Sequence, residues 1–216
     1  MTMRINADFS KPAIVVPTDD AWVHSPEAGV DRLMLDRIGD EVARATSLVR
    51  YAPGSSFGRH EHAMGEEFLV LDGVFSDEHA DYPTGTYVRN PPGTGHAPHC
   101  VDGSRIFVKL RQFDESDLMP VVIDTTAEEG WQDDVLSLHA YGTERVAMVR
   151  VTSGHEAPIE AGPGGVELLL VSGQLRHGGD TLPAESWLRF PEGAPVALTA
   201  TADSVLWTKS GHLPSD

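Results

Sequence analysis

Residues 54–73 read GSSFGRHEHAMGEEFLVLDG and place four ionisable side chains just before an apolar run. His60 and His62 are two positions apart, and Glu66 and Glu67 are adjacent. Residues i and i+2 of a β-strand point to one face, so the two imidazoles can reach a single ion. Glu66 has the parity of the histidines, whereas Glu67 falls on the opposite face if the strand is regular. The stretch predicts a metal site that uses Glu66 rather than Glu67.

A repeat with a constant offset of 100 positions surrounds this stretch. The paired segments are Ser47–Tyr51 with Ala147–Val151, Gly54 with Gly154, Glu67–Gly73 with Glu167–Gly173, and Arg89, Pro91 and Gly93 with Arg189, Pro191 and Gly193. One offset shared by strands and turns indicates that a β unit occurs twice. We place the boundary near Met119-Pro120. The expected domains are 1–119, which binds metal, and 120–216, a degenerate copy without metal ligands.

Short runs of alternating apolar and polar residues recur along the chain, as in Thr46–Tyr51 and Ile106–Leu110. The 21 glycines and 15 prolines punctuate these runs. This pattern is typical of an all-β sandwich or barrel built from many short strands.

Four polar residues of the first copy are missing from the second. The pairs are His60 with Glu160, His62 with Gly162, Glu66 with Val166, and His96 with Val196. Groups that disappear together while scaffold residues remain are most simply members of one site. Glu67 is retained as Glu167, which favours a role in the fold.

His96 follows the turn Asn90–Gly95, whose prolines and glycines permit a tight reversal toward the other histidines. Three imidazoles and one carboxylate leave positions open for water or substrate on an octahedral metal. The set suits Fe, Mn, Ni, Cu or Zn and excludes a soft thiolate site. The alternative is a closed zinc site that only stiffens the barrel.

Charge and cysteine content exclude several classes of function. The 216 residues carry 33 acidic and 16 basic side chains, a net charge of −17, which repels nucleic acid and anionic membranes. Cys100 is the single cysteine, so an internal disulfide or a CxxC motif is excluded. No apolar run has the length of a membrane span or a signal peptide, and we expect a cytoplasmic protein.

The chain resembles the cupins at two motifs. Gly54, His60, His62, Glu66 and Gly73 match the first motif, G(x)5HxH(x)3-4E(x)6G, and Gly85, Pro91, Gly93 and His96 match the second, G(x)5PxG(x)2H. Cys100 replaces the terminal Asn of the second motif, which is not a ligand in the family. The segment Val74–Thr84 between the motifs is interpreted as a hairpin.

Residues 60–98 are most similar to the cupin domain of ChrR-type anti-sigma factors and are also similar to acetylacetone-cleaving dioxygenases. They read HEHAMGEEFLVLDGVFSDEHADYPTGTYVRNPPGTGHAP. The resemblance implies a bicupin, two double-stranded β-helix (jelly-roll) barrels in tandem. It implies one divalent transition metal, namely Fe, Zn, Mn or Ni, held by His60, His62, Glu66 and His96. A homodimer is also expected, because bicupins often dimerise.

One feature of the anti-sigma factors is missing. Those proteins bind their sigma factor through an N-terminal zinc-binding helical domain with paired Cys and His ligands. In this sequence, the residues before 45 contain one histidine, His24, and no cysteine. A sigma factor is therefore not an expected partner, and a small-molecule substrate or ligand is.

The sequence leaves several functions open. The first is a non-haem Fe(II) dioxygenase acting on a β-dicarbonyl or related carbonyl compound, with Glu66 as a fourth ligand or as the catalytic base. The second is a metal-dependent sensor or regulatory binding module, and the third is a sugar or keto-acid isomerase. Lys109 and Arg111 alternate with apolar residues and are expected to share one face, either lumen or solvent; in the lumen they would suit an anionic or carbonyl substrate.

Overall fold

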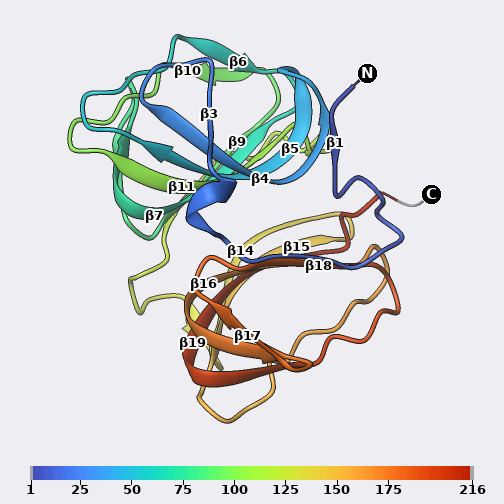
Figure 1. Cartoon of the computed structure of the whole chain (residues 1–216). Coiled ribbons are helices and arrows are strands. Elements are labelled where there is room, and N and C mark those ends of the chain that lie inside the picture. Colours follow the sequence, from blue (N-terminus) through green and yellow to red (C-terminus); the bar gives the residue numbers. More distant parts are fainter. Residues whose placement is uncertain (1, 215–216) are drawn as a thin grey trace. The chain divides into compact units, whose positions relative to one another are not determined.

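Short antiparallel strands dominate residues 2–214, which are the part of the chain that the computed structural model describes (Figure 1). Within those residues no α-helix occurs, and the single 3-10 turn is Asp19–Ala21. No helix there has the length and apolar character needed to cross a membrane. The predicted all-β class is confirmed.

The chain divides into two compact units. The first comprises Thr18–Thr126 with the residues up to Ala7, and the second comprises Asp8–Pro17 with the residues from Ala127 onward. Each unit is a barrel-like arrangement of twisted strands (Figure 1).

The first unit has a main sheet and a small separate sheet. The main sheet runs β1 (Arg4–Ile5), β4 (Val30–Gly39), β5 (Ala43–Tyr51), β11 (Ser104–Leu110), β7 (Glu66–Ser76), β9 (Thr86–Asn90) and β12 (Val121–Asp124). β3 (Val23–His24) pairs with β4, and β8 (Asp81–Pro83) pairs with β7. The small sheet is β6 (His60–His62) with β10 (Thr94–His96). The β7–β8 pairing, Val74 with Pro83, confirms the predicted hairpin.

The second unit repeats the main sheet at the offset seen in the sequence. Its order is β13 (Trp131–Gln132), β14 (Val135–Tyr141), β15 (Glu144–Val151), β19 (Leu198–Ser210), β16 (Val166–His177), β18 (Trp187–Phe190) and β2 (Ala13–Val15), with β17 (Asp180–Pro183) on β16. Thus β15, β16, β17 and β18 correspond to β5, β7, β8 and β9. In the described residues of this unit, no strands correspond to β6 and β10.

The outer strand of each main sheet comes from a distant part of the chain. In the first unit, β12 pairs with β9, and Val121 lies opposite Arg89. In the second unit, the N-terminal strand β2 pairs with β18, and Ala13 lies opposite Arg189. Position in the sequence therefore does not by itself assign a strand to a unit.

The two interiors are filled differently. In the second unit the core includes Leu168, Leu170, Leu188 and Leu206, all fully buried, and Val196 packs against it. In the first unit the core gathers around Phe68, Val70, Phe75 and Tyr82, with Cys100 buried among them. The first interior also leaves space beside the histidines, as described below.

Candidate metal centre

The small sheet places two histidines side by side. In the antiparallel register of β6 and β10, His96 lies opposite His60 and Thr94 lies opposite His62. A Cβ on Gly95 would lie 2.5 Å from the backbone oxygen of His60, so only glycine permits this close approach. The alternation along β6 points Glu61 to solvent while His62 is buried.

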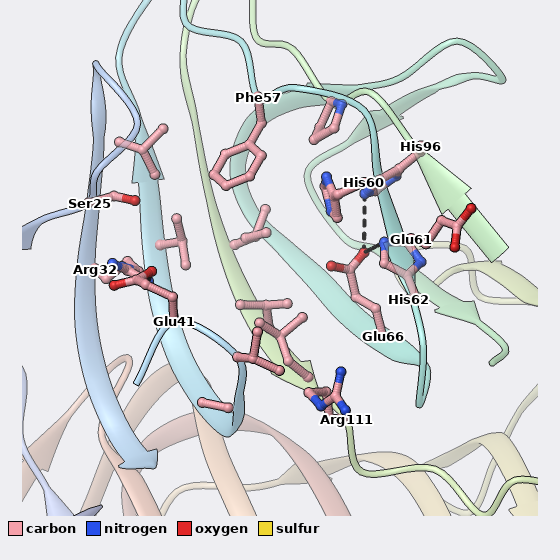
Figure 2. Close-up of a pocket in the computed structure, with 18 of the residues that line it drawn as sticks. Ser25, Arg32, Glu41, Phe57, His60, Glu61, His62, Glu66, His96 and Arg111 are labelled. Atoms are coloured by element: carbon pink, nitrogen blue, oxygen red, sulfur yellow. Dashed lines mark ion pairs between the residues drawn. The ribbon is translucent and has the colours of Figure 1, made fainter. Parts of the chain in front are cut away.

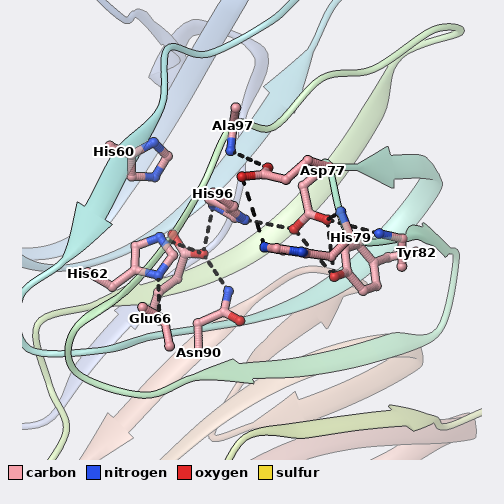
Figure 3. A network of polar contacts seen from close by, with 12 residues as sticks. His60, His62, Glu66, Asp77, His79, Tyr82, Asn90, His96 and Ala97 are labelled. Carbon is pink, nitrogen blue, oxygen red and sulfur yellow. Dashed lines mark hydrogen bonds and ion pairs between the residues drawn. The ribbon is translucent and has the colours of Figure 1, made fainter.

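Glu66 completes the group from a neighbouring strand. Gly65, with φ of +76°, turns the chain between β6 and β7, and Glu66 is the first residue of β7. Its Oε1 lies 3.5 Å from His62 Nε2 and 3.4 Å from His96 Nε2 (Figure 3). One donor atom from each of His60, His62, Glu66 and His96 lies within 4.8 Å of the others. The structure therefore brings together all four residues that the sequence singled out.

Each imidazole is held through its Nδ1 atom. His60 Nδ1 is 3.0 Å from the backbone oxygen of Gly58, which can only accept. His96 Nδ1 is 3.0 Å from a carboxylate oxygen of Asp77.

The partner of His62 Nδ1 is the Thr94 hydroxyl at 3.2 Å, and that hydroxyl donates its own hydrogen to the Pro91 carbonyl at 2.7 Å. All three Nδ1 atoms therefore donate. The lone pair of every imidazole is on Nε2, which is the tautomer that a metal ligand needs.

Burial favours the neutral form of His62 and His96. It lowers the pKa of His62 to about 3, with the neighbouring histidines adding to the effect. Burial also lowers the pKa of His96, although Asp77 opposes the shift. Burial raises the pKa of Glu66 to about 7, and the Asn90 amide at 3.3 Å works against that rise. Neutral imidazoles are the form that binds a cation.

The donor set fits a divalent transition metal. His62 Nε2 is buried and has no hydrogen-bond partner among the described residues, a costly state that a bound cation would relieve. Nitrogen ligands with one carboxylate suit Fe, Mn, Ni or Zn, and no sulfur donor belongs to the group. The four residues could hold one ion.

Asp77 is the residue of this site that spacing alone missed. It lies in the β7–β8 turn and accepts backbone N–H bonds from His79 and Ala80 as well as the His96 bond. The repeat offered a signal that could have identified Asp77, because the second copy has His177 at the equivalent position and so lacks this carboxylate together with the four clustered residues. A carboxylate behind a ligand histidine orients the ring and strengthens its basicity.

Glu67 lies on the face of β7 opposite Glu66, although the turn at Gly65 interrupts the regular strand on which the parity argument relied. Its Oε2 accepts hydrogen bonds from the Tyr87 hydroxyl at 2.6 Å and from Arg89 Nη1 at 2.9 Å, all fully buried. The second copy keeps the role, since Glu167 accepts from Trp187 Nε1 at 2.7 Å. Glu67 therefore stabilises the fold.

An apolar cavity of about 340 Å³ opens beside the histidines, inside the first unit (Figure 2). Its walls include Val30, Val49, Phe57, Phe75, Ile106 and Val108. The polar lining residues are the four clustered residues with Glu61 at one end, and Ser25, Arg32, Glu41, Tyr51 and Arg111 elsewhere in the lining.

The two basic residues after Phe107 do not share a face, so that expectation is wrong. Lys109 is fully buried away from the cavity, and its Nζ donates to Thr46 Oγ1 at 3.0 Å. Arg111 lies just beyond the end of β11 with φ of +59°, which breaks the alternation and turns its side chain into the cavity lining.

Comparisons with known proteins agree with this fold. The family model described as ChrR Cupin-like domain matches residues 10–114. No curated protein matches the chain by sequence.

Three solved structures illustrate the fold. The bacterial pirin YhhW of Escherichia coli in complex with nickel(II) has a TM-score of 0.67 at 14% identity, over 94% of this chain and 100% of that one. A proposed dioxygenase of Nostoc punctiforme has a TM-score of 0.65 at 12% sequence identity, and the alignment covers 99% of this chain and 84% of that one. A cupin 2 conserved barrel domain protein of Leptotrichia buccalis has a TM-score of 0.61 at 13% sequence identity, and the alignment covers 95% of this chain and 98% of that one. At these identities the likeness establishes the fold alone. The chain thus has the cupin fold, and its residues 10–114 match the model of the ChrR cupin-like domain.

Proposed function

We propose that this protein is a metal-dependent enzyme, a non-haem Fe(II) dioxygenase that acts on a β-dicarbonyl or related small carbonyl compound. One observation carries the proposal: a nitrogen atom of each of three imidazoles and a buried carboxylate converge at the end of an apolar cavity of about 340 Å³. An apolar cavity with a few convergent polar groups is the usual form of a small-molecule site. A purely stiffening zinc site would need no such cavity.

In this proposal His60, His62 and His96 hold the metal through Nε2. Fe(II) held there would supply Lewis acidity toward the carbonyl oxygens of the substrate and electrons for O2. The Nδ1 contacts of the three rings fix their orientation, so the protein presents a preorganised site.

Glu66 is the proposed base if it does not serve as a fourth ligand. Burial holds its pKa at about 7, so near neutral pH its carboxylate can accept a proton from the substrate carbon between two carbonyl groups. Asn90 Nδ2 donates to Glu66 Oε1 and fixes the direction of the carboxylate. The apolar walls limit water at the reacting atoms and orient the substrate.

Oxygen uptake tests the proposal. Protein loaded anaerobically with Fe(II) is mixed with a panel of β-diketones and keto acids, and the same protein loaded with Zn(II) serves as the redox-inactive control. We expect substrate-dependent uptake with Fe(II) only, lost in His62→Ala and retained in a variant of the exposed His99. No uptake over the whole panel, with one Fe(II) bound per chain, would contradict the proposal.

The family match supports a second candidate, a metal-bearing sensor module that alters its contact with a regulatory protein. It predicts a specific partner whose binding changes when the metal is removed or oxidised. Pull-downs with wild-type and His62→Ala protein test this candidate. A partner that binds both equally would contradict it.

A further inference from the structure

Arg32 is a cation in the lining of the cavity, far from the histidines. It lies on β4 and is separated from Glu66 on β7 by three strand spacings, through β5 and β11. At about 4.8 Å per spacing, this path is about 14 Å along the curved sheet. Figure 2 shows Arg32 and the histidines on opposite sides of the cavity, with apolar side chains between them.

The guanidinium of Arg32 is poorly satisfied. Its Nε is buried and has no hydrogen-bond partner among the described residues. Its Nη1 lies 3.6 Å from Glu41 Oε2, which is beyond hydrogen-bond distance, and the Glu41 side chain is 69% exposed. A guanidinium presents Nε and Nη as a fork that matches the two oxygens of a carboxylate.

Arg32 is a cationic group in a protein that is strongly acidic, so it offers an anion a favourable binding position within the cavity. The chain carries a net charge of −17, so most of its surface repels anions. Arg32 is only 18% exposed and adjoins apolar walls formed by Val30 and Val49, where water screens charge weakly. A ligand with an anionic group and a hydrocarbon chain would complement both the Arg32 guanidinium and the apolar walls of the cavity.

We propose that the cavity binds an organic acid whose carboxylate pairs with Arg32 and whose hydrocarbon chain lies along the apolar walls. The substrate of the reaction proposed above is then an oxo acid, with its carbonyl group at the histidines. Only the carbonyl end of this inference rests on the proposed function. Binding of the carboxylate end requires no metal.

Calorimetric titration of metal-depleted, full-length protein with butanoate, hexanoate and octanoate tests the carboxylate end. We expect affinity to rise about fourfold per added methylene, because each buries apolar surface. The neutral hexanamide should bind about tenfold to a hundredfold more weakly than hexanoate, as the charge-assisted pair is lost. Equal binding of hexanoate and hexanamide would overturn the inference.

Three variants locate the carboxylate. Arg32→Met should weaken octanoate about tenfold to a hundredfold and abolish the preference for hexanoate over hexanamide. Arg50→Met is the matched control, because Arg50 lies on the adjacent strand β5, outside the cavity lining, and pairs with Asp31 at 2.9 Å. Arg111→Met removes the other arginine of the lining, whose backbone N–H donates to Gly65 near Glu66. Loss of the preference in Arg111→Met but not in Arg32→Met would overturn the assignment to Arg32.

Glu41→Gln provides a test that misfolding cannot imitate. Removing the competing carboxylate from Arg32 should tighten octanoate binding about two- to fivefold and leave hexanamide unchanged. Unchanged octanoate affinity would contradict the pairing.

Metal-loaded protein separates the two proposals. There, 7-oxooctanoate should bind more tightly than octanoate only if the carbonyl reaches the metal. Octanoate binding through Arg32 without that gain would support the present inference and contradict the proposed carbonyl site. The reverse result, a gain without dependence on Arg32, would contradict this inference alone.

Discussion

The groups that accept a hydrogen bond from Nδ1 of the three histidines determine which ring nitrogen remains available to bind a metal. A backbone carbonyl, a hydroxyl and a carboxylate hold His60, His62 and His96, and in every case Nε2 retains its lone pair. The parity of β7 separates Glu66 from Glu67, and the sequence alone predicted this separation. The acceptors could not be predicted in the same way, because two of them, Thr94 and Asp77, reach their partners through strand and turn pairing.

His62→Ala should lower bound metal from about one ion per chain to near zero, since it removes a buried Nε2 that has no hydrogen-bond partner among the described residues. Elemental analysis of protein purified without chelators or nickel affinity measures the loss. His99→Ala is the control, because His99 is exposed and is not part of the cluster. Full metal occupancy in His62→Ala would show that the cluster is not the site.

Asp77→Asn should weaken metal binding about tenfold to a hundredfold while the ligands remain. The amide oxygen can still accept hydrogen bonds but no longer places a negative charge behind His96. Competition with a metal-sensitive dye measures the affinity. Asp81→Asn, at an exposed position of the same hairpin, should leave it unchanged.

At the scale of elements, the sheet of β6 and β10 distinguishes the two units. Its strands carry all three histidines, and residues 160–162 and 194–196 of the second unit form no strand. The repeat had shown that the ligands are absent from the second copy. That the strands are absent as well emerged only from the structure, because three-residue strands have too few positions for a periodic signal.

Gly95→Ala should reduce both metal affinity and stability. The added Cβ meets a backbone oxygen at 2.5 Å, so β10 must move away from β6 and separate His96 from His60. We expect a loss of about 1–3 kcal/mol in the free energy of unfolding. Denaturant titration and the dye competition measure the two effects. Gly58→Ala is the control, since its Cβ would have no atom within 4 Å, and equal behaviour of the two variants would contradict the close-approach argument.

At the scale of the whole molecule, the first unit has a cavity beside its histidines, whereas apolar core residues occupy the equivalent positions of the second unit. The equivalents of Glu66 and His96 are Val166 and Val196, and both belong to or pack against the second core. The buried pairing of Glu67 with Arg89 is retained as Glu167 opposite Arg189. The second unit thus keeps the scaffold of the first and fills its interior with apolar side chains.

Leu170→Ala should therefore destabilise the protein without changing its metal content. Leu170 is fully buried in the second core, and such a truncation costs about 2–5 kcal/mol. Thermal unfolding and elemental analysis of the folded protein measure the two quantities. Val122→Ala, at a residue that is 63% exposed, should change stability by less than about 0.5 kcal/mol. Loss of metal from folded Leu170→Ala would place the ion's support in the second unit.

The sequence by itself determined the all-β class, the repeat at an offset of 100 and the four clustered residues, because strand alternation and motif spacing are local properties. Only the tertiary structure decided that β12 closes the first unit while β2 completes the second, that Asp77 lies behind His96, and that Arg111 and Lys109 diverge. These features depend on pairing between distant segments and on a single positive φ, and neither leaves a periodic trace in the chain.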